Sequence, residues 1–231
     1  MILGLLENLI NHSKSMLILL MQKHHVSIDT ILRTIFENYV YLKFVLEKDT
    51  DKRAKSYGCS TKLKEIQLMD NLAEDSLRGH SLREFLKIKK DDVSKLSKEM
   101  SETYKERVID QYLNELGMKR LEQKWYNLNQ NTKTLKKLCE DLDLTVEYEL
   151  IYSILSTETH AKDAIQRFFF EKNYIRILEV MKNELLYVSM AGLYLIESVR
   201  LIYTYYNLKK CLTNFNALIA INDKFRKAAK R

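Results

Sequence analysis

The sequence predicts an all-α protein, built as a single-domain helical bundle of long antiparallel helices. Of its 231 residues only 5 are glycine and none is proline, whereas average usage gives about 16 glycines and about 12 prolines at this length. These two residue types supply the special backbone angles of tight turns, so their scarcity argues against a β-sandwich or β-barrel. The length and the hydrophobic share of 46% suit one domain over residues 1–231 with a sizeable core.

Apolar side chains recur at helical spacing along the first third of the chain. A helix is predicted over residues 2–23, with seven apolar residues on one broad face: Leu5, Leu6, Leu9, Met16, Leu17, Leu20 and Met21. A second helix is predicted over 28–48, with Ser27 as its N-cap residue. The run Asp49-Thr50-Asp51 is typical of a turn and cap, and a third helix is predicted over 52–74.

The middle of the chain is more polar. Charged residues crowd residues 75–102 while apolar positions thin out, which predicts an exposed, charged helical insertion. A helix over 103–116 is expected to end at Gly117, since glycine is favoured just after a helix end.

Four further helices are expected toward the C-terminus. Two are predicted over 132–142 and 145–160. Residues 173–231 are expected to form two long C-terminal helices, the first over 173–211 with a bend near Gly192, the second ending in a basic tail.

Charge and cysteine usage limit the cellular setting. Lysine and arginine number 38 against 31 acidic residues, for a net charge of +7. This excess permits contact with nucleic acid, and it also serves solubility. The three cysteines lie far apart, which indicates a reducing compartment and neither a disulfide framework nor a structural zinc site. We therefore expect a cytoplasmic protein that needs no metal or other cofactor.

Two segments are apolar enough to be candidate targeting or membrane elements. The N-terminus has neither a basic start nor a small-residue cleavage site, so it does not predict a signal peptide. Residues 185–206 are the most hydrophobic stretch, but Glu197 and Arg200 lie within one turn of each other there, among several tyrosines. This pattern favours a buried bundle helix, and we expect no membrane partner.

Glycine-dependent phosphate motifs are absent from the sequence. There is no P-loop, no dinucleotide fingerprint and no nucleophile-elbow motif, and the H-E-x-x-H zinc motif is also missing. Phosphate cradles need closely spaced glycines so that the backbone can approach the ligand. The sequence therefore argues against a classical nucleotide-binding fold.

Polar residues interrupt two of the predicted helices at a spacing of four. Arg33 and Glu37 lie one turn apart within an apolar helix, and Arg53 and Tyr57 repeat the spacing on the next helix. An exposed Arg–Glu pair would contribute only a few tenths of a kcal/mol, about 0.2–0.5 kcal/mol. A half-buried pair would instead be part of a polar cluster, and the pattern alone leaves both interpretations open.

A second polar stripe lies on the predicted helix over 145–160. Tyr148, Tyr152, Ser156 and His160 step by four and so share one face. A histidine near neutrality can act as general acid or base, and a neighbouring serine or tyrosine can orient a substrate. A histidine at a helix C-terminus is also stabilised by the helix dipole when charged, which is a purely structural reason for its position.

These residues together resemble a bacterial family of unknown function, DUF5677. The resemblance spans residues 15–165 and is carried by the run Ile31-Leu-Arg-Thr-Ile-Phe-Glu37, by Arg53-Ala-Lys-Ser-Tyr57, by Trp125 and by the stripe from Tyr148 to His160. The shared polar positions are Arg33, Glu37, Trp125, Tyr152, Ser156 and His160.

That family in turn is similar to the HEPN superfamily of small helical bundles. Many members are metal-independent ribonucleases of toxin–antitoxin and phage-defence systems that work as dimers, and their usual motif is an arginine followed four to six residues later by a histidine. Here Tyr152 and Ser156 precede His160 instead. The resemblance implies that Arg33 or Arg53, on a neighbouring helix, would supply the cation.

The sequence supports two hypotheses of different kinds. In the first, the chain cleaves RNA: His160 moves the proton, Arg33 or Arg53 stabilises the phosphorane charge, Glu37 holds an arginine, and Ser156 and Tyr152 complete the site. Substrate would be bound by Arg53, Tyr57, Trp125, Lys89 and Lys90, with an aromatic ring stacked on a base. In the second, the chain is a non-enzymatic interaction or sensor module, and the same residues form a buried polar network.

Overall fold

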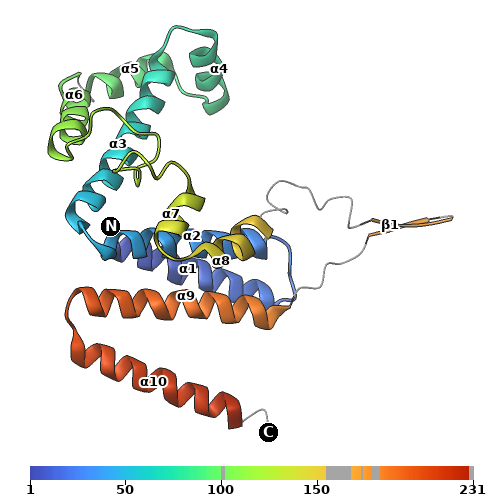
Figure 1. The fold of residues 1–231 in the computed structure, drawn as a ribbon. Coiled ribbons are helices and arrows are strands. Elements are labelled where there is room, and N and C mark those ends of the chain that lie inside the picture. The colour runs from blue at the N-terminus through green and yellow to red at the C-terminus, as the bar shows by residue number, and fades with distance from the viewer. Residues whose placement is uncertain (100–101, 155–167, 173, 178–182, 229–231) are drawn as a thin grey trace. The chain divides into compact units, whose positions relative to one another are not determined.

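The computed structural model describes residues 1–99, 102–154, 168–172, 174–177 and 183–228 (Figure 1). Within these residues every regular element is a helix except one two-stranded hairpin, so the predicted all-α class is confirmed. The chain divides into two compact units, Met1–Lys48 with Cys139–Arg231 and Asp49–Leu138. The prediction of a single domain concerns how these two units associate, and it stays a prediction.

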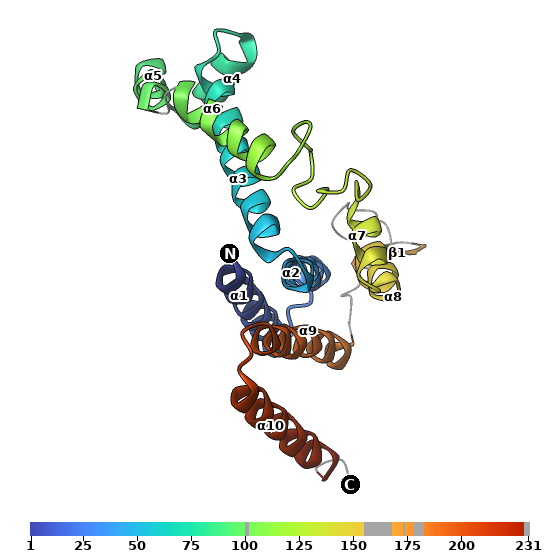
Figure 2. The same ribbon diagram turned by 60° about the vertical axis from the view of Figure 1, so that its left-hand side comes forward.

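The first unit is built around α2 (Ile28–Glu47). This helix packs against α1 (Ile2–Met21) on one side and α9 (Glu184–Tyr205) on another, as both views show (Figures 1 and 2). Its buried residues form the centre of the core: Ile28, Leu32, Ile35, Phe36, Tyr39, Val40, Leu42, Phe44, Val45 and Leu46. Because α2 is covered on several sides, a charged residue on it needs a specific partner.

Helix α1 confirms most of the predicted apolar face. Leu5, Leu9, Met16 and Leu20 are buried, but Leu17 and Met21 are exposed, so the predicted face was too broad. The reason is geometric: neighbouring helices cover one stripe of α1 and leave its flanks in solvent. Ser27 precedes α2 as predicted, although its backbone is left-handed (φ 68°) and its side chain makes no capping hydrogen bond.

The helix predicted over 145–160 begins at Thr145 as expected and then changes from α-helical to π-helical geometry. It consists of α8 (Thr145–Glu147) and the π-helical segment η2 (Tyr148–Ile154), which packs on α2. The remaining predicted residues of this helix lie outside the described part of the chain.

The helix predicted over 173–211 was wrong at its beginning. Strands β1 (Phe168–Glu171) and β2 (Tyr174–Ile177) pair antiparallel, with Phe168 opposite Ile177. Phenylalanine, tyrosine and isoleucine favour strands over helices, and they cluster here. Helix α9 then continues through Gly192 without interruption and ends at Tyr205, before α10 (Lys209–Ala228).

The second unit is built around α3 (Thr50–Ala73). It packs with α4 (Leu77–Leu86), α5 (Lys90–Glu99) and α6 (Glu102–Asp110), and α6 continues into the π-helical segment η1 (Gln111–Glu115). Gly117 follows with φ 63°, which confirms the predicted helix end. Helix α7 (Leu135–Asp141) leads back to the first unit.

The charged insertion predicted over 75–102 is helical within its described residues. Most of the described side chains of α4 and α5 are exposed, as expected, but both helices pack on α3. Arg83 is buried and donates from Nη1 to the carbonyl oxygens of Leu72 (2.5 Å) and Glu74 (3.0 Å). A cation thus satisfies carbonyl groups at the end of α3 that the helix itself leaves unpaired.

Candidate functional site

A charged stripe runs along α2 through the core of the first unit. We define the α2 stripe as Asp29, Arg33 and Glu37, which lie at successive spacings of four and therefore share one helix face. The Arg33 Nε donates to Glu37 Oε1 over 3.1 Å, and the two side chains are 18% and 28% exposed. The pair is therefore half-buried, which decides between the two interpretations that the sequence left open.

The N-terminal member of the stripe makes a buried contact with α9. The hydroxyl group of Tyr187 donates to Asp29 Oδ1 over 2.5 Å, and both residues are buried. A hydrogen bond to a charged carboxylate in a buried position is among the stronger polar contacts in proteins. It fixes the first turn of α9 against the first turn of α2.

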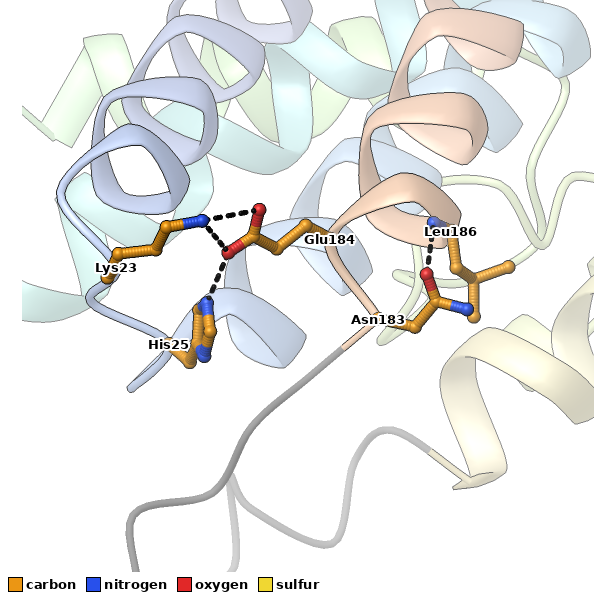
Figure 3. A network of polar contacts seen from close by, with 5 residues as sticks. All are labelled: Lys23, His25, Asn183, Glu184 and Leu186. Atoms are coloured by element: carbon orange, nitrogen blue, oxygen red, sulfur yellow. Dashed lines mark hydrogen bonds and ion pairs between the residues drawn. The ribbon is translucent and has the colours of Figure 1, made fainter. Parts of the chain in front are cut away.

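A second polar contact joins the same two regions (Figure 3). Glu184, at the first position of α9, accepts from Lys23 Nζ at both carboxylate oxygens (3.0 and 3.2 Å). Its Oε1 also lies 3.0 Å from Nε2 of the buried His25. We call Lys23, His25 and Glu184 the α9 clasp. The hydrogen bond from Lys23, and after it that from His25, holds the pKa of the Glu184 carboxyl below its ordinary value.

Buried aromatic side chains line α2 beyond the stripe. The Tyr194 ring centroid lies 5.5 Å from that of Phe36 and 5.0 Å from that of Tyr39. Burial, followed by the charges of Glu197 and Glu147, raises the pKa of Tyr39 to about 12. Burial also raises the pKa of Tyr194, whose hydroxyl group makes no hydrogen bond. These phenols stay protonated at neutral pH, so they are poor candidates for a general base.

The buried thiol of this unit is equally inert. Burial raises the pKa of Cys139 to about 12, and the charges of Glu147 and Glu37 add to the effect. Since the thiolate is the nucleophilic form, Cys139 is not suited to nucleophilic catalysis. Cysteines 59, 139 and 211 are all free thiols.

The predicted stripe on the helix over 145–160 is described only at its start. Tyr148 and Tyr152 belong to η2, which packs on α2, and nothing is described of the Tyr152 side chain. Ser156 and His160 lie outside the described residues. The segment η2, which precedes them in the chain, packs against α2, the helix that carries Arg33 and Glu37.

The predicted substrate-binding residues of α3 belong to the core of the second unit. Arg53 is buried, and so is Trp125, whose carbonyl oxygen accepts from Ser56 Oγ over 2.6 Å. The half-buried Tyr57 packs edge-on against Trp125, with ring centroids 5.1 Å apart. In this arrangement the indole ring is covered by protein, and a base would need it to be uncovered before stacking on it.

The two lysines predicted to bind substrate are exposed. Lys90 is paired with Asp75 at 2.5 Å, and this hydrogen bond and charge lower the pKa of the Asp75 carboxyl. Lys89 is exposed directly before the first residue of α5. The Lys90–Asp75 ion pair does not test whether these lysines bind RNA. No cluster of three or more His, Cys, Asp or Glu side chains suited to hold a metal ion occurs in the residues that the structure describes.

Sequence reasoning missed five residues that the structure brings together at the beginning of α9. Lys23, His25 and Asp29 contact Glu184 and Tyr187, which are 158 to 161 positions away in sequence. The one signal available was Asp29 itself, a charged residue in a strongly apolar helix. No pattern in the sequence could have named its partner.

Comparison with known proteins places the chain in a family but gives it no activity. Searches of curated proteins and of solved structures found no match. The model of a family of unknown function, DUF5677, matches residues 1–175. The matched range contains the whole α2 stripe and ends within the β hairpin. The chain therefore belongs to the DUF5677 family.

Proposed function

We propose that this protein is a HEPN-like, metal-independent endoribonuclease that acts in a bacterial phage-defence or toxin–antitoxin setting. The observation that carries the proposal is the half-buried Arg33–Glu37 pair on α2, with η2 packed on the same helix. Glu37 restrains the guanidinium group, and an oriented cation in a partly desolvated place is what a pentavalent phosphorane needs.

The chemistry requires no group beyond the chain and its substrate. A ribose 2′-oxygen attacks the adjacent phosphorus, the bond from phosphorus to the 5′-oxygen breaks, and a 2′,3′-cyclic phosphate and a 5′-hydroxyl group form. In this proposal His160 accepts the 2′-hydroxyl proton or returns a proton to the leaving oxygen, and Arg33 stabilises the phosphorane charge. Ser156 and Tyr152 would orient the substrate.

The two arginines considered from the sequence are not equivalent candidates. Arg53 is buried in the second unit, whereas Arg33 is partly exposed and is held by a carboxylate. A cation that must reach a phosphate needs access to it, which supports Arg33. With Arg33 in this role, Arg53 becomes a residue of the core.

The setting of the reaction rests on the family resemblance. We propose RNA as the substrate, a cytoplasmic location, a homodimeric enzyme without cofactor, and a protein antitoxin as partner. The net charge of +7 supports contact with the RNA backbone, because each neutralised phosphate releases a counterion.

A non-enzymatic interaction or sensor module is the second candidate. The observation that favours it is the Asp29–Tyr187 hydrogen bond, which is buried and joins two helices. In that case the α2 stripe would fix how the helices pack and would touch no substrate.

The experiment that separates these functions compares purified variants on total RNA and tRNA in EDTA. The wild-type chain should cleave, while Arg33→Ala and His160→Ala should not, and all should melt at similar temperatures. Arg200→Ala is the matched control, since it removes another half-exposed arginine that is paired with a glutamate, Glu197, and it should cleave normally. Absence of cleavage by the wild type, with Arg33→Ala melting well below it, would support the interaction module instead.

A further inference from the structure

The outer side of α9 is apolar but uncovered. Tyr187, Ala191, Tyr194, Ser198 and Ile202 are buried on the side that meets the bundle. On the opposite side Leu185, Leu186 and Leu193 are 54%, 43% and 50% exposed. A helix that is apolar all round is normally buried on all sides. Within the described residues, α9 is the one helix long and apolar enough to cross a membrane by these two criteria alone, although it is also a core helix.

Helix α10, which follows α9, also has exposed apolar side chains. It is held to α9 near the turn between them, where the Tyr203 and Phe215 ring centroids lie 5.9 Å apart and Arg200 Nε donates to Asn216 Oδ1 over 2.9 Å. Beyond that contact its apolar side is open, with Leu218 64% and Ile221 50% exposed. An apolar stripe on a helix without a core to cover indicates that something else covers it.

The charge of α10 indicates what that partner is. The helix carries five basic residues and one acidic residue, for a net charge of +4: Lys209, Lys210, Lys224, Arg226 and Lys227 against Asp223. At helical spacing Lys209 and Lys224 lie away from Leu218, so the helix has a basic side and an apolar side. Tyr205 and Tyr206, exposed at the turn before α10, are the residue type favoured at a membrane interface.

These features together fit one occupant better than its rivals. RNA would satisfy the positive charge but would not cover aliphatic side chains. A second copy would bring a like-charged α10 against the first, which is unfavourable. A bilayer that contains anionic lipid offers negative headgroups and hydrocarbon at the same surface, and basic amphipathic helices lie in it.

We propose that α10, with the outer face of α9, binds the surface of an anionic lipid membrane, with α10 lying in the plane of the headgroups. This inference departs from the expectation, drawn from the sequence, of a protein without a membrane partner. It does not depend on the proposed ribonuclease activity.

The test is flotation of the full chain with vesicles of phosphatidylcholine, with and without phosphatidylglycerol. The protein should float with the anionic vesicles, and raising the salt concentration should release it. Leu218→Asp combined with Ile221→Asp should lower binding by about tenfold or more, because two buried aliphatic side chains are lost. Lys209→Glu with Lys210→Glu should remove the preference for phosphatidylglycerol.

The matched control is Leu77→Asp, which changes a leucine that is 90% exposed in the other unit and should leave flotation unchanged. Circular dichroism and melting curves of each variant establish that its helix content and its stability match those of the wild type. No flotation with anionic vesicles, or flotation that survives Leu218→Asp with Ile221→Asp, would overturn the proposal. A mass of two chains by light scattering that falls to one in those variants, without flotation of the wild type, would assign the surface to a second copy and overturn it too.

Discussion

Each charged side chain on α2 needs a specific partner, because the apolar residues around it offer no hydrogen bonds. Arg33 and Glu37 satisfy each other, and Asp29 is satisfied by Tyr187 from α9. Burying a polar group without a hydrogen bond costs about 2–7 kcal/mol. The contacts of these three residues avoid that cost. The sequence pattern predicted the first pair, and only the fold provides the second.

Replacing Tyr187 tests the buried hydrogen bond. Tyr187→Phe keeps the ring but removes the donor to Asp29, so the buried carboxylate loses a partner, and the free energy of unfolding should fall by about 1–3 kcal/mol. Tyr205→Phe, on the same helix but exposed, should change it by less than about 0.5 kcal/mol. Urea denaturation of both variants measures the difference, and equal values for the two would refute the role given to Tyr187.

The α9 clasp should make stability depend on pH. The pKa of Glu184 is lower in the folded chain than its ordinary value of 4.5. The stabilisation is therefore fully present above about pH 4.5 and is lost as the pH falls through the lowered pKa. Melting temperatures of the wild type and Glu184→Gln should differ at pH 7 and converge at acid pH. The exposed Glu7→Gln serves as control, and a gap that persists at low pH would show that charge is not the cause.

Two glycines show how the same residue type serves opposite purposes at the element scale. Gly117 ends a helical segment with φ 63°, a backbone conformation that a side chain disfavours, whereas Gly58 lies inside α3 with open space around its missing Cβ. Gly117→Ala should therefore destabilise the chain by about 1 kcal/mol, and Gly58→Ala should stabilise it by about 0.5–1 kcal/mol. Chemical denaturation reads out both, and the same sign for both substitutions would contradict this view.

Helices with regular apolar spacing could be predicted from the sequence. The hairpin could not, because there the strand preference of individual residues decides the structure. The bounds of α1, α2 and α3 agree with the expected ranges to within two residues because their apolar spacing is regular. The run Phe168 to Ile177 contains apolar residues without that period, and its aromatic and β-branched side chains favour strands. The helical prediction there gave too little weight to residue type.

The candidate site depends, at the scale of the whole molecule, on contacts that no single stretch of sequence encodes. Arg33 and Glu37 were predictable because they are four residues apart, but Glu184 meets Lys23 across 161 positions. Arg53 and Trp125 have the residue types of a binding site, and burial in the second unit makes them part of its core. Sequence spacing thus gives pairs on one helix, whereas burial and long-range partners require the fold.

The chemistry of the RNA ends made by the wild-type chain in EDTA tests the proposed function most directly. Attack by the 2′-hydroxyl group predicts fragments with a 2′,3′-cyclic phosphate and a 5′-hydroxyl group, and Arg33→Ala should make far fewer of them. Mass spectrometry of cleaved oligoribonucleotides identifies both ends. Fragments with a 3′-hydroxyl group and a 5′-phosphate, or RNA that stays intact, would contradict a metal-independent ribonuclease centred on Arg33.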